Sequence, residues 1–211
     1  MYLPEQFKET RTDVLHALMR ARPLATLVTS SESGLVANHV PLQALAEPAP
    51  LGALRGHIAR ANPLWREYAQ GGEALAIFQG PDAYISPSLY PSKLQTAEVV
   101  PTWDYAVVHA HGTLRFIDDS EWLHGFVAGL TATHEASRLK PWKIGDAPRD
   151  YIEKMLRMIV GFEFSIVKLS GKWKVSQNRP AADQLGVVQG LQSSGDADSR
   201  EIAAMLAARS R

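Results

Sequence analysis

The sequence has no cysteine among its 211 residues. This absence excludes a disulfide framework, a thiolate metal site and a cysteine nucleophile. The glycine-dependent motifs of nucleotide-binding and hydrolase folds are also missing: neither the Gly-x-Gly-x-x-Gly fingerprint, nor the Gly-x-x-x-x-Gly-Lys-Ser/Thr loop, nor the Gly-x-Ser-x-Gly elbow occurs. The sequence therefore gives no support for a Rossmann fold, a P-loop enzyme or a nucleophile-elbow hydrolase.

The chain also has no net charge and no long apolar run. Lys plus Arg and Asp plus Glu each number 22. This balance weakens a prediction of DNA binding, which depends on an excess of basic residues facing phosphates, although a local basic patch is still compatible with it. No apolar run approaches the length of a membrane span, and residues 1–8 do not resemble a secretion signal. We therefore expect a cytoplasmic protein without a membrane partner.

Short apolar runs bounded by turn residues outnumber helical patterns. They predict strands at residues 24–29, 35–43, 51–58, 103–117, 161–169 and 172–176, and one bent strand formed by residues 74–79 and 83–86. Helical spacing and capping residues predict helices at 12–22, after Asn62-Pro63, at 119–134, 149–159 and 199–209. Successive hairpins with helices between them favour an α+β fold that is mainly β, a closed or half-closed antiparallel barrel with helices packed outside.

Glycine and proline mark the expected interruptions. We expect a hairpin turn at Gly34, a bend at Gly80-Pro81 and a turn at Ser170-Gly171. The length and the ordinary apolar content of 45% are typical of one large globular domain. We place this domain at residues 1–188, followed at 189–211 by a flexible Ser/Gly/Asp-rich tail with a weak terminal helix.

Residues 84–112 combine hydroxyl groups, aromatic rings and one cation between two predicted strands. A phosphate requires charge-assisted hydrogen bonds and a flat ring system requires apolar walls, so this mixture predicts a site for an anionic, flat, aromatic ligand. The alternative is that the rings belong to the barrel core. The candidate site residues of this segment are Ser86, Ser88, Lys93, Thr102, Trp103 and Tyr105.

Two further segments carry donors suited to such a ligand. In residues 55–63, cations end a strand just before a helix N-terminus, where anions bind readily; a solvated strand end with an Asn cap is the alternative. In residues 176–179, Gln177 and Arg179 supply amide and guanidinium groups at a strand end, or simply form a surface loop. His109 and His111 share one side of a strand and could bind a metal, with His39 or His57 as a third ligand, but we favour the alternative that they line a half-polar barrel surface. We assign no metal ligand.

Taken in order, these motifs resemble the PaiB-like, FMN-binding negative transcriptional regulators. The resemblance covers most of the chain and rests on Met-Tyr-Leu-Pro-Glu-Gln-Phe at the start, Asn38-His39-Val40-Pro41, residues 57–63, Tyr84-Ile85-Ser86-Pro87-Ser88 through Lys93, Val100-Pro101-Thr102-Trp103 and Ser176-Gln177-Asn178-Arg179. Two positions depart from the expected pattern. Leu89 stands where Trp is expected and Asp104 where Asn is expected, and a carboxylate near a flavin would disfavour its anionic reduced form.

The resemblance implies an FMN-binding split barrel of Greek-key type, related to pyridoxamine-phosphate oxidases and flavin reductases. It also implies a homodimer with FMN at the subunit interface. Its cofactor-binding residues would be Asn38 and His39, together with Ser86 and Ser88. His57, Asn62 and Lys93 would face the phosphate or the ribityl chain. Thr102, Trp103 and Tyr105 would flank the ring, and Gln177 and Arg179 would complete the site.

Three functions remain open from the sequence. The first is an FMN-binding protein with a redox or sensing role, and the second is an FMN-dependent oxidoreductase similar to a flavin reductase or oxidase. The third is a DNA-binding negative regulator without flavin, which lacks support from a helix-turn-helix with a basic recognition helix. No residue stands out as a committed acid or base, so no catalytic residue is assigned.

Overall fold

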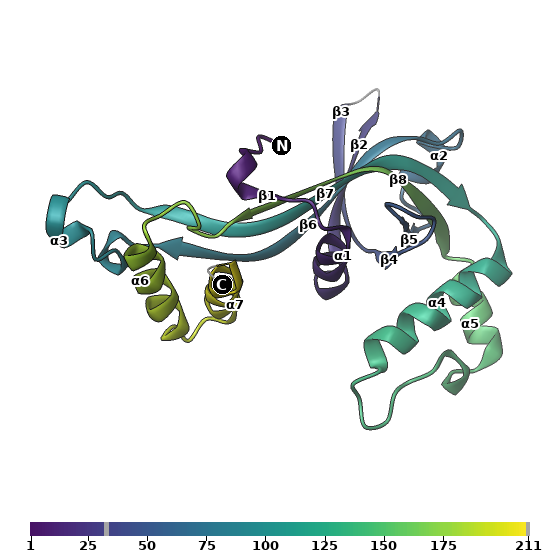
Figure 1. Ribbon diagram of the computed structural model, residues 1–211. Helices are drawn as coiled ribbons and strands as arrows, with labels where there is room; N and C mark the ends of the chain where they lie inside the picture. Colours follow the sequence, from purple (N-terminus) through teal and green to yellow (C-terminus); the bar gives the residue numbers. More distant parts are fainter. Residues whose placement is uncertain (32–33, 210–211) are drawn as a thin grey trace. The chain divides into compact units, whose positions relative to one another are not determined.

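The computed structural model describes residues 1–31 and 34–209 and shows a mainly antiparallel sheet with helices around it (Figure 1). Its strands are β1 (Lys8–Glu9), β2 (Leu24–Ser31), β3 (Gly34–Pro41), β4 (Gln43–Leu45), β5 (Ala53–Ala59), β6 (Gly72–Ile85), β7 (Thr102–Ile117) and β8 (Ile159–Lys174). Its α-helices are α1 (Thr12–Ala21), α2 (Leu64–Glu67), α3 (Lys93–Thr96), α4 (Ser120–Glu135), α5 (Arg149–Leu156), α6 (Ala181–Gln192) and α7 (Ala197–Arg209). Short 3-10 turns lie at Glu5–Phe7, Pro87–Leu89 and Ile144–Asp146, called η1, η2 and η3. The predicted α+β, mainly β class is confirmed.

The strands form one sheet in the order β3-β2-β6-β7-β8-β5-β4, with β1 paired to β8. β2 and β3 form the predicted hairpin, in register from Leu24 opposite Pro41 to Ser31 opposite Gly34, while its turn at residues 32 and 33 lies outside the described residues. β3 also contacts β5, which stands near the other end of this order. Within residues 19–77 the strands β3 and β5 therefore curl toward each other, as in the expected half-closed barrel.

The chain divides into two compact units. The first unit comprises Met1–Leu18, Phe78–His109 and Ser170–Arg211, and the second comprises Met19–Ile77 and Ala110–Leu169. The second unit has its core on the inner side of the curled strands. Leu54 of β5 pairs with Phe164 of β8 and Gly56 with Phe162, and all three large side chains are fully buried. Burial of such side chains contributes most of the stability of a sheet of this kind.

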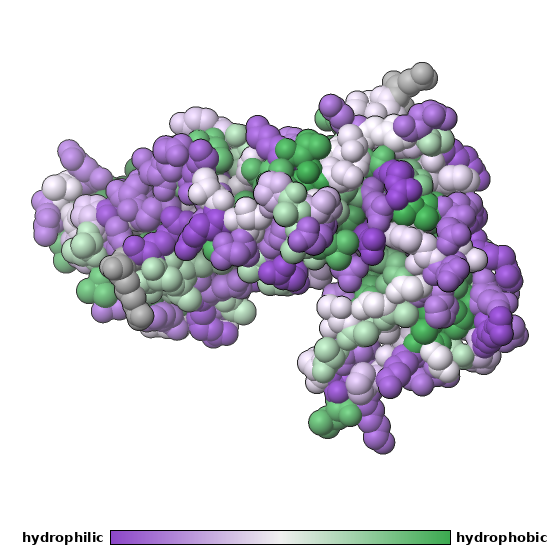
Figure 2. Space-filling view, turned by 45° about the vertical axis from the view of Figure 1, so that its right-hand side comes forward, coloured by the Kyte–Doolittle hydropathy of each residue, from purple (hydrophilic) through white to green (hydrophobic). Residues whose placement is uncertain are grey.

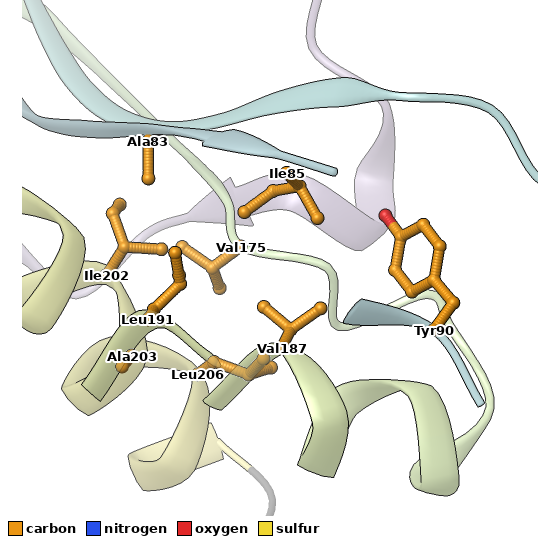
Figure 3. Packing of buried hydrophobic residues seen from close by; sticks show 9 residues of the cluster. All are labelled: Ala83, Ile85, Tyr90, Val175, Val187, Leu191, Ile202, Ala203 and Leu206. Atoms are coloured by element: carbon orange, nitrogen blue, oxygen red, sulfur yellow. The ribbon is translucent and has the colours of Figure 1, made fainter. Parts of the chain in front are cut away.

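The first unit has a separate core between the sheet and the C-terminal helices. Ala83 and Ile85 of β6 face buried residues of α6 and α7, and Figure 3 shows these side chains pointing toward one another around Val175. The complete cluster is Ala83, Ile85, Tyr90, Val175, Val187, Leu191, Ile202, Ala203 and Leu206. Residue 189, where we expected a tail to begin, lies inside α6, and α7 begins at Ala197 rather than near residue 199. The helix therefore continues across the expected boundary.

The predicted turn at Ser170-Gly171 is wrong, because β8 runs through these residues without a break. β6 is one strand through Gly80-Pro81, as expected. Gly171 pairs with Glu9 of β1, and a side chain on it would lie 2.3 Å from Leu15. At Gly80 an added Cβ would lie 2.8 Å from the carbonyl oxygen of Ala106. These glycines allow close approach within a strand rather than a turn.

None of the described helices is both long and apolar enough to cross a membrane.

Replacing Ile202 with Ala tests whether α7 is part of the packed core. Ile202 is completely buried, so Ile202→Ala should lower the free energy of unfolding by about 2–5 kcal/mol. Leu185 on α6 is 57% exposed, and Leu185→Ala is the matched control, with an expected change within about 0.5 kcal/mol. Urea titration followed by circular dichroism measures both, and equal small losses would show that α7 does not stabilise the fold.

Candidate functional site

The predicted site residues divide between the two units, and each group is described in its own unit. The second unit contains Asn38, His39, His57 and Asn62. The first unit contains Ser86, Ser88, Lys93, Thr102, Trp103, Tyr105, Gln177 and Arg179.

In the second unit, two predicted asparagines form a direct contact. The side-chain Nδ2 of Asn62 donates to Oδ1 of Asn38 on β3 over 2.8 Å. Oδ1 of Asn62 accepts from the backbone N of Leu64 over 3.0 Å, which fixes Asn62 at the start of α2. The Nδ2 atom of Asn38 is buried and has no hydrogen-bond partner among the described residues. A buried amide without a partner is unfavourable, so this group is a candidate donor to a ligand.

His57 provides a second buried polar atom in this unit. Its ring meets the edge of Phe126 of α4, with ring centroids 5.9 Å apart. Nδ1 is buried and has no hydrogen-bond partner in the described part of the chain. Burial lowers the pKa of His57, so the imidazole is neutral at pH 7 and suits a hydroxyl group better than a doubly charged phosphate. His39 follows Asn38 on β3 and is exposed, so its side chain points to the other face of the strand.

In the first unit, Lys174 of β8 holds the start of β7. Its ammonium donates to Oγ1 of Thr102 over 2.7 Å and to the backbone carbonyl of Trp103. The Trp103 ring itself is 56% exposed and makes an edge contact with Tyr84 at 5.8 Å between centroids. Thr102 and Trp103 are thus positioned by an internal cation, while the indole remains available to a ligand or a partner.

Asp104 lies beneath these residues and is completely buried. Its carboxylate accepts from Oγ of Ser176 over 2.6 Å and from Nζ of Lys174 over 3.2 Å. Burial raises the pKa of Asp104, against the hydrogen bonds from Ser176 and Lys174, which favour the charged form. The carboxylate that replaces the expected Asn is therefore paired inside the protein, and its charge is compensated by Lys174.

Gln177 and Arg179 already have contacts in the first unit. The Gln177 amide donates to the carbonyl oxygens of Gln6 and Trp173 and accepts from the backbone N of Val175 over 2.8 Å. The Arg179 guanidinium lies over the Tyr90 ring, 4.8 Å from its centroid. Gln177 therefore closes the turn after β8, and a ligand would have to compete with these bonds to use its side chain.

The other predicted residues of the first unit are more accessible. Oγ of Ser86 accepts from the backbone N of Ser88 over 3.2 Å and so caps η2. The Lys93 side chain is exposed and forms no ion pair or hydrogen bond with the described residues. Tyr105 is half-buried, with the ammonium of Lys172 at 5.3 Å from its ring centroid. Lys93 is thus the predicted site cation that stays available to an anion.

The sequence alone did not single out Lys174, which binds Thr102, or Asp183, which binds Ser92 next to Lys93. Lys174 lies two residues before Ser176, so its position next to the Ser176–Arg179 motif was a usable signal. Asp183 lies in the first turn of α6, where an acidic residue is usually explained by its favourable interaction with the helix dipole. Neither residue belongs to a metal site, since no cluster of three His, Asp or Glu side chains suited to a metal occurs among the residues described.

Asp104→Asn should change how thermal stability depends on pH. The raised pKa means that the folded state holds this proton more strongly than the unfolded chain. The contribution of this proton to the free energy of unfolding is fully present below the pKa that Asp104 has in the unfolded chain. It is lost as the pH rises through the higher pKa that Asp104 has in the folded protein. The Tm difference, variant minus wild type, should therefore become more positive from about pH 4 to about pH 7. Differential scanning fluorimetry measures it, with Asp82→Asn on β6 as control; a constant difference would contradict the buried, protonatable carboxyl.

Comparison with solved structures identifies the fold. A conserved hypothetical protein from Mycobacterium tuberculosis superposes with a TM-score of 0.59 at 10% identity, covering 85% of this chain and 94% of that one. The FAD and heme binding protein from Mycobacterium smegmatis superposes with a TM-score of 0.57 at 19% identity, covering 79% and 73%. Both therefore share the fold of this chain.

Sequence comparison identifies the family. The family model described as "Putative FMN-binding domain" matches residues 1–168. The protease synthase and sporulation protein PAI 2 of Bacillus subtilis is 30% identical over 206 residues, which is 98% of this chain and 96% of that protein. An uncharacterized protein of Emericella nidulans is 33% identical over 230 residues, with 92% of each chain covered. The chain thus belongs to the PaiB-like family of FMN-binding domains, as its motifs predict, and FMN is its cofactor.

Proposed function

We propose that this chain binds FMN as a homodimer, at sites to which both protomers contribute, and uses the bound flavin in a redox or sensing role. The observation that carries this proposal is that two buried polar atoms of the predicted site, Nδ2 of Asn38 and Nδ1 of His57, have no hydrogen-bond partner among residues 1–31 and 34–209. Native proteins leave few such atoms unpaired, and those that remain call for a ligand or solvent partner.

The residues present fit the chemical groups of FMN. A ribityl or phosphate oxygen can accept from the Asn38 amide, and a ribityl hydroxyl can donate to the neutral His57 ring. The exposed ammonium of Lys93 suits a phosphate oxygen, and the exposed Trp103 ring offers an apolar wall to a flat heterocycle. When bound, FMN supplies the capacity for hydride or electron transfer, and these residues bind and orient it.

Exposed apolar side chains in the first unit support the homodimer. Tyr84, Leu94, Val100 and Trp103 are 52%, 93%, 65% and 56% exposed, and all four lie within ten residues of Lys93. Figure 2 shows hydrophobic patches interrupting a mainly hydrophilic surface on one face of the molecule. We define two half-sites, the Asn38–His57–Asn62 group and the Thr102–Trp103–Lys93 group. A two-fold interface would cover the exposed apolar side chains and would place each half-site of one protomer next to the complementary half-site of its partner, at two equivalent positions.

A sensing role is supported by the relative from Bacillus subtilis. That protein is named for protease synthesis and sporulation, and its name gives no metabolic reaction. The flavin would then report a redox state or its own availability to the rest of the protein.

The visible spectrum of the purified protein tests flavin binding directly. Oxidised FMN bands that persist after dialysis at close to one flavin per chain would support the proposal. A colourless protein that retains no added FMN would overturn it, and salt-dependent retention of a promoter fragment would then be the next measurement.

Lys93→Ala should weaken FMN binding through the phosphate. Loss of a charge-assisted hydrogen bond should cost about 1.5–3 kcal/mol of binding free energy, while the affinity for riboflavin, which lacks the phosphate, should stay the same. Quenching of flavin fluorescence measures both affinities, and Lys140→Ala in the exposed segment after α4 is the control for loss of one positive charge. Unchanged FMN affinity would remove Lys93 from the site.

Mixing two defective variants tests the shared site. Lys93→Ala and Asn62→Ala each damage a different half-site, so every site in either homodimer carries one defect. If the half-sites come from different protomers, subunit exchange should restore about one quarter of all sites to wild-type affinity. Titration of the mixture with FMN measures this fraction. No restored fraction, in a mixture shown by mass spectrometry to contain heterodimers, would place each site within one protomer.

A further inference from the structure

The C-terminal helix α6 packs against the segment that carries Lys93. The family model ends at residue 168, so α6 and α7 lie beyond the matched region. In Figure 1 the two helices lie side by side, and α6 contacts the η2 turn. The segment between η2 and α3, residues 87–96, is thus supported from one side by a helix that the family match does not include.

Asp183 of α6 makes the polar contact with this segment. Its carboxylate accepts from the backbone N of Ser92 over 3.0 Å and from Oγ of Ser92 over 2.7 Å. Only 1% of Asp183 is exposed, so both hydrogen bonds are shielded from water. Ser92 is the residue immediately before Lys93 and is the N-cap of α3. The carboxylate therefore determines where α3, and with it Lys93, begins.

Two glycines on the same face of α6 allow the close approach. An added Cβ at Gly186 would lie 2.2 Å from the carbonyl oxygen of Leu89, and one at Gly190 would lie 2.4 Å from a Leu89 methyl group. Asp183, Gly186 and Gly190 are spaced by three and four residues, which places them along one helical face. Leu89, which stands where the family pattern predicts Trp, is the residue that fits against this face, and a larger ring there would meet the helix.

The residues around Ser92 are anchored as well. Tyr90 is buried in the first-unit core together with Val187 of α6 (Figure 3). The Arg179 guanidinium lies over the Tyr90 ring. Residues 89, 90 and 92 are therefore each held by the C-terminal part of the chain, whereas Lys93 directly after them is exposed. A flexible lysine binds a phosphate better when its backbone is already held in place, because less conformational entropy is lost on binding.

We propose that Asp183 is the positioning residue that holds Lys93 for the phosphate of FMN. This inference rests on the proposed function, in which Lys93 binds that phosphate. It predicts that α6 tunes the affinity for the phosphorylated flavin without touching the ligand.

The first test compares FMN with riboflavin in the full-length protein. Asp183→Ala should raise the Kd for FMN about tenfold and change the Kd for riboflavin less than about twofold, because only the phosphate contact is disturbed. Asp183→Asn keeps the size of the side chain and one acceptor oxygen, so its Kd for FMN should lie between those of Asp183→Ala and the wild type. Asp196→Asn is the matched control, since Asp196 caps α7 of the same helix pair through Ser199 and does not contact Ser92.

A second test needs no flavin. Trypsin cleaves after Lys93, and Asp183→Ala should speed this cleavage in the flavin-free protein several-fold, whereas Asp196→Asn should not. Mass spectrometry of the two fragments identifies the site. If Asp183→Ala proves too unstable to purify, Ser92→Ala replaces it in this test. Ser92→Ala removes one of the two hydrogen bonds without altering α6, so it should speed cleavage after Lys93 to a smaller extent.

The outcomes separate this inference from the proposed function. If Lys93→Ala weakens FMN binding and Asp183→Ala does not, the positioning role is overturned while flavin binding stands. If Asp183→Ala weakens FMN and riboflavin equally, Asp183 has only a structural role and the inference fails. If the wild-type protein binds no FMN, both proposals fail together, and faster cleavage after Lys93 would show only that Asp183 orders the segment.

Discussion

The pairing of buried carboxylates is the constraint on which the first unit depends. A carboxylate removed from water needs hydrogen bonds or a cation, because an unpaired buried charge is strongly destabilising. Asp104 has no exposed surface, and its partners Lys174 and Ser176 come from β8 and from the turn after it. The requirement to pair one charge therefore joins the start of β7 to the end of β8. Thr102 and Trp103, two of the predicted site residues, take their positions from this junction.

Two other buried acids in the same unit obey the same rule. Glu9 is 5% exposed and is bound by Arg11 and, at 2.7 Å, by Arg209 near the end of α7. Hydrogen bonds from Arg11 hold the pKa of Glu9 below its usual range, so it stays charged at neutral pH. Asp183 binds Ser92 in the same manner. Each acid connects segments that are distant in sequence, and together they tie the C-terminal helices to β1 and to the segment bearing Lys93.

Much of the fold follows from local patterns in the sequence. The first helix, the β2–β3 hairpin, the long β7 strand and the capped helix α4 were all predicted within a few residues. Apolar periodicity and capping residues are local properties, so they are visible without the structure. The turn expected at Gly171 is wrong because glycine permits both a turn and a close approach between strands. Only the neighbouring Leu15, distant in sequence, decides between these uses.

The class of fold, the family and the chemical types needed for an anionic aromatic ligand can be read from the sequence. These properties depend on composition, order and spacing, which a chain carries before it folds. Which of the candidate groups are already engaged becomes visible only in the folded chain. Gln177 is occupied by backbone groups and Asp104 is paired with Lys174, whereas Lys93, Asn38 and His57 keep atoms without a partner in the described part of the chain. The physical reason is that hydrogen bonding and burial arise from long-range contacts, so whether a polar atom is available to a ligand depends on residues far from it in the sequence.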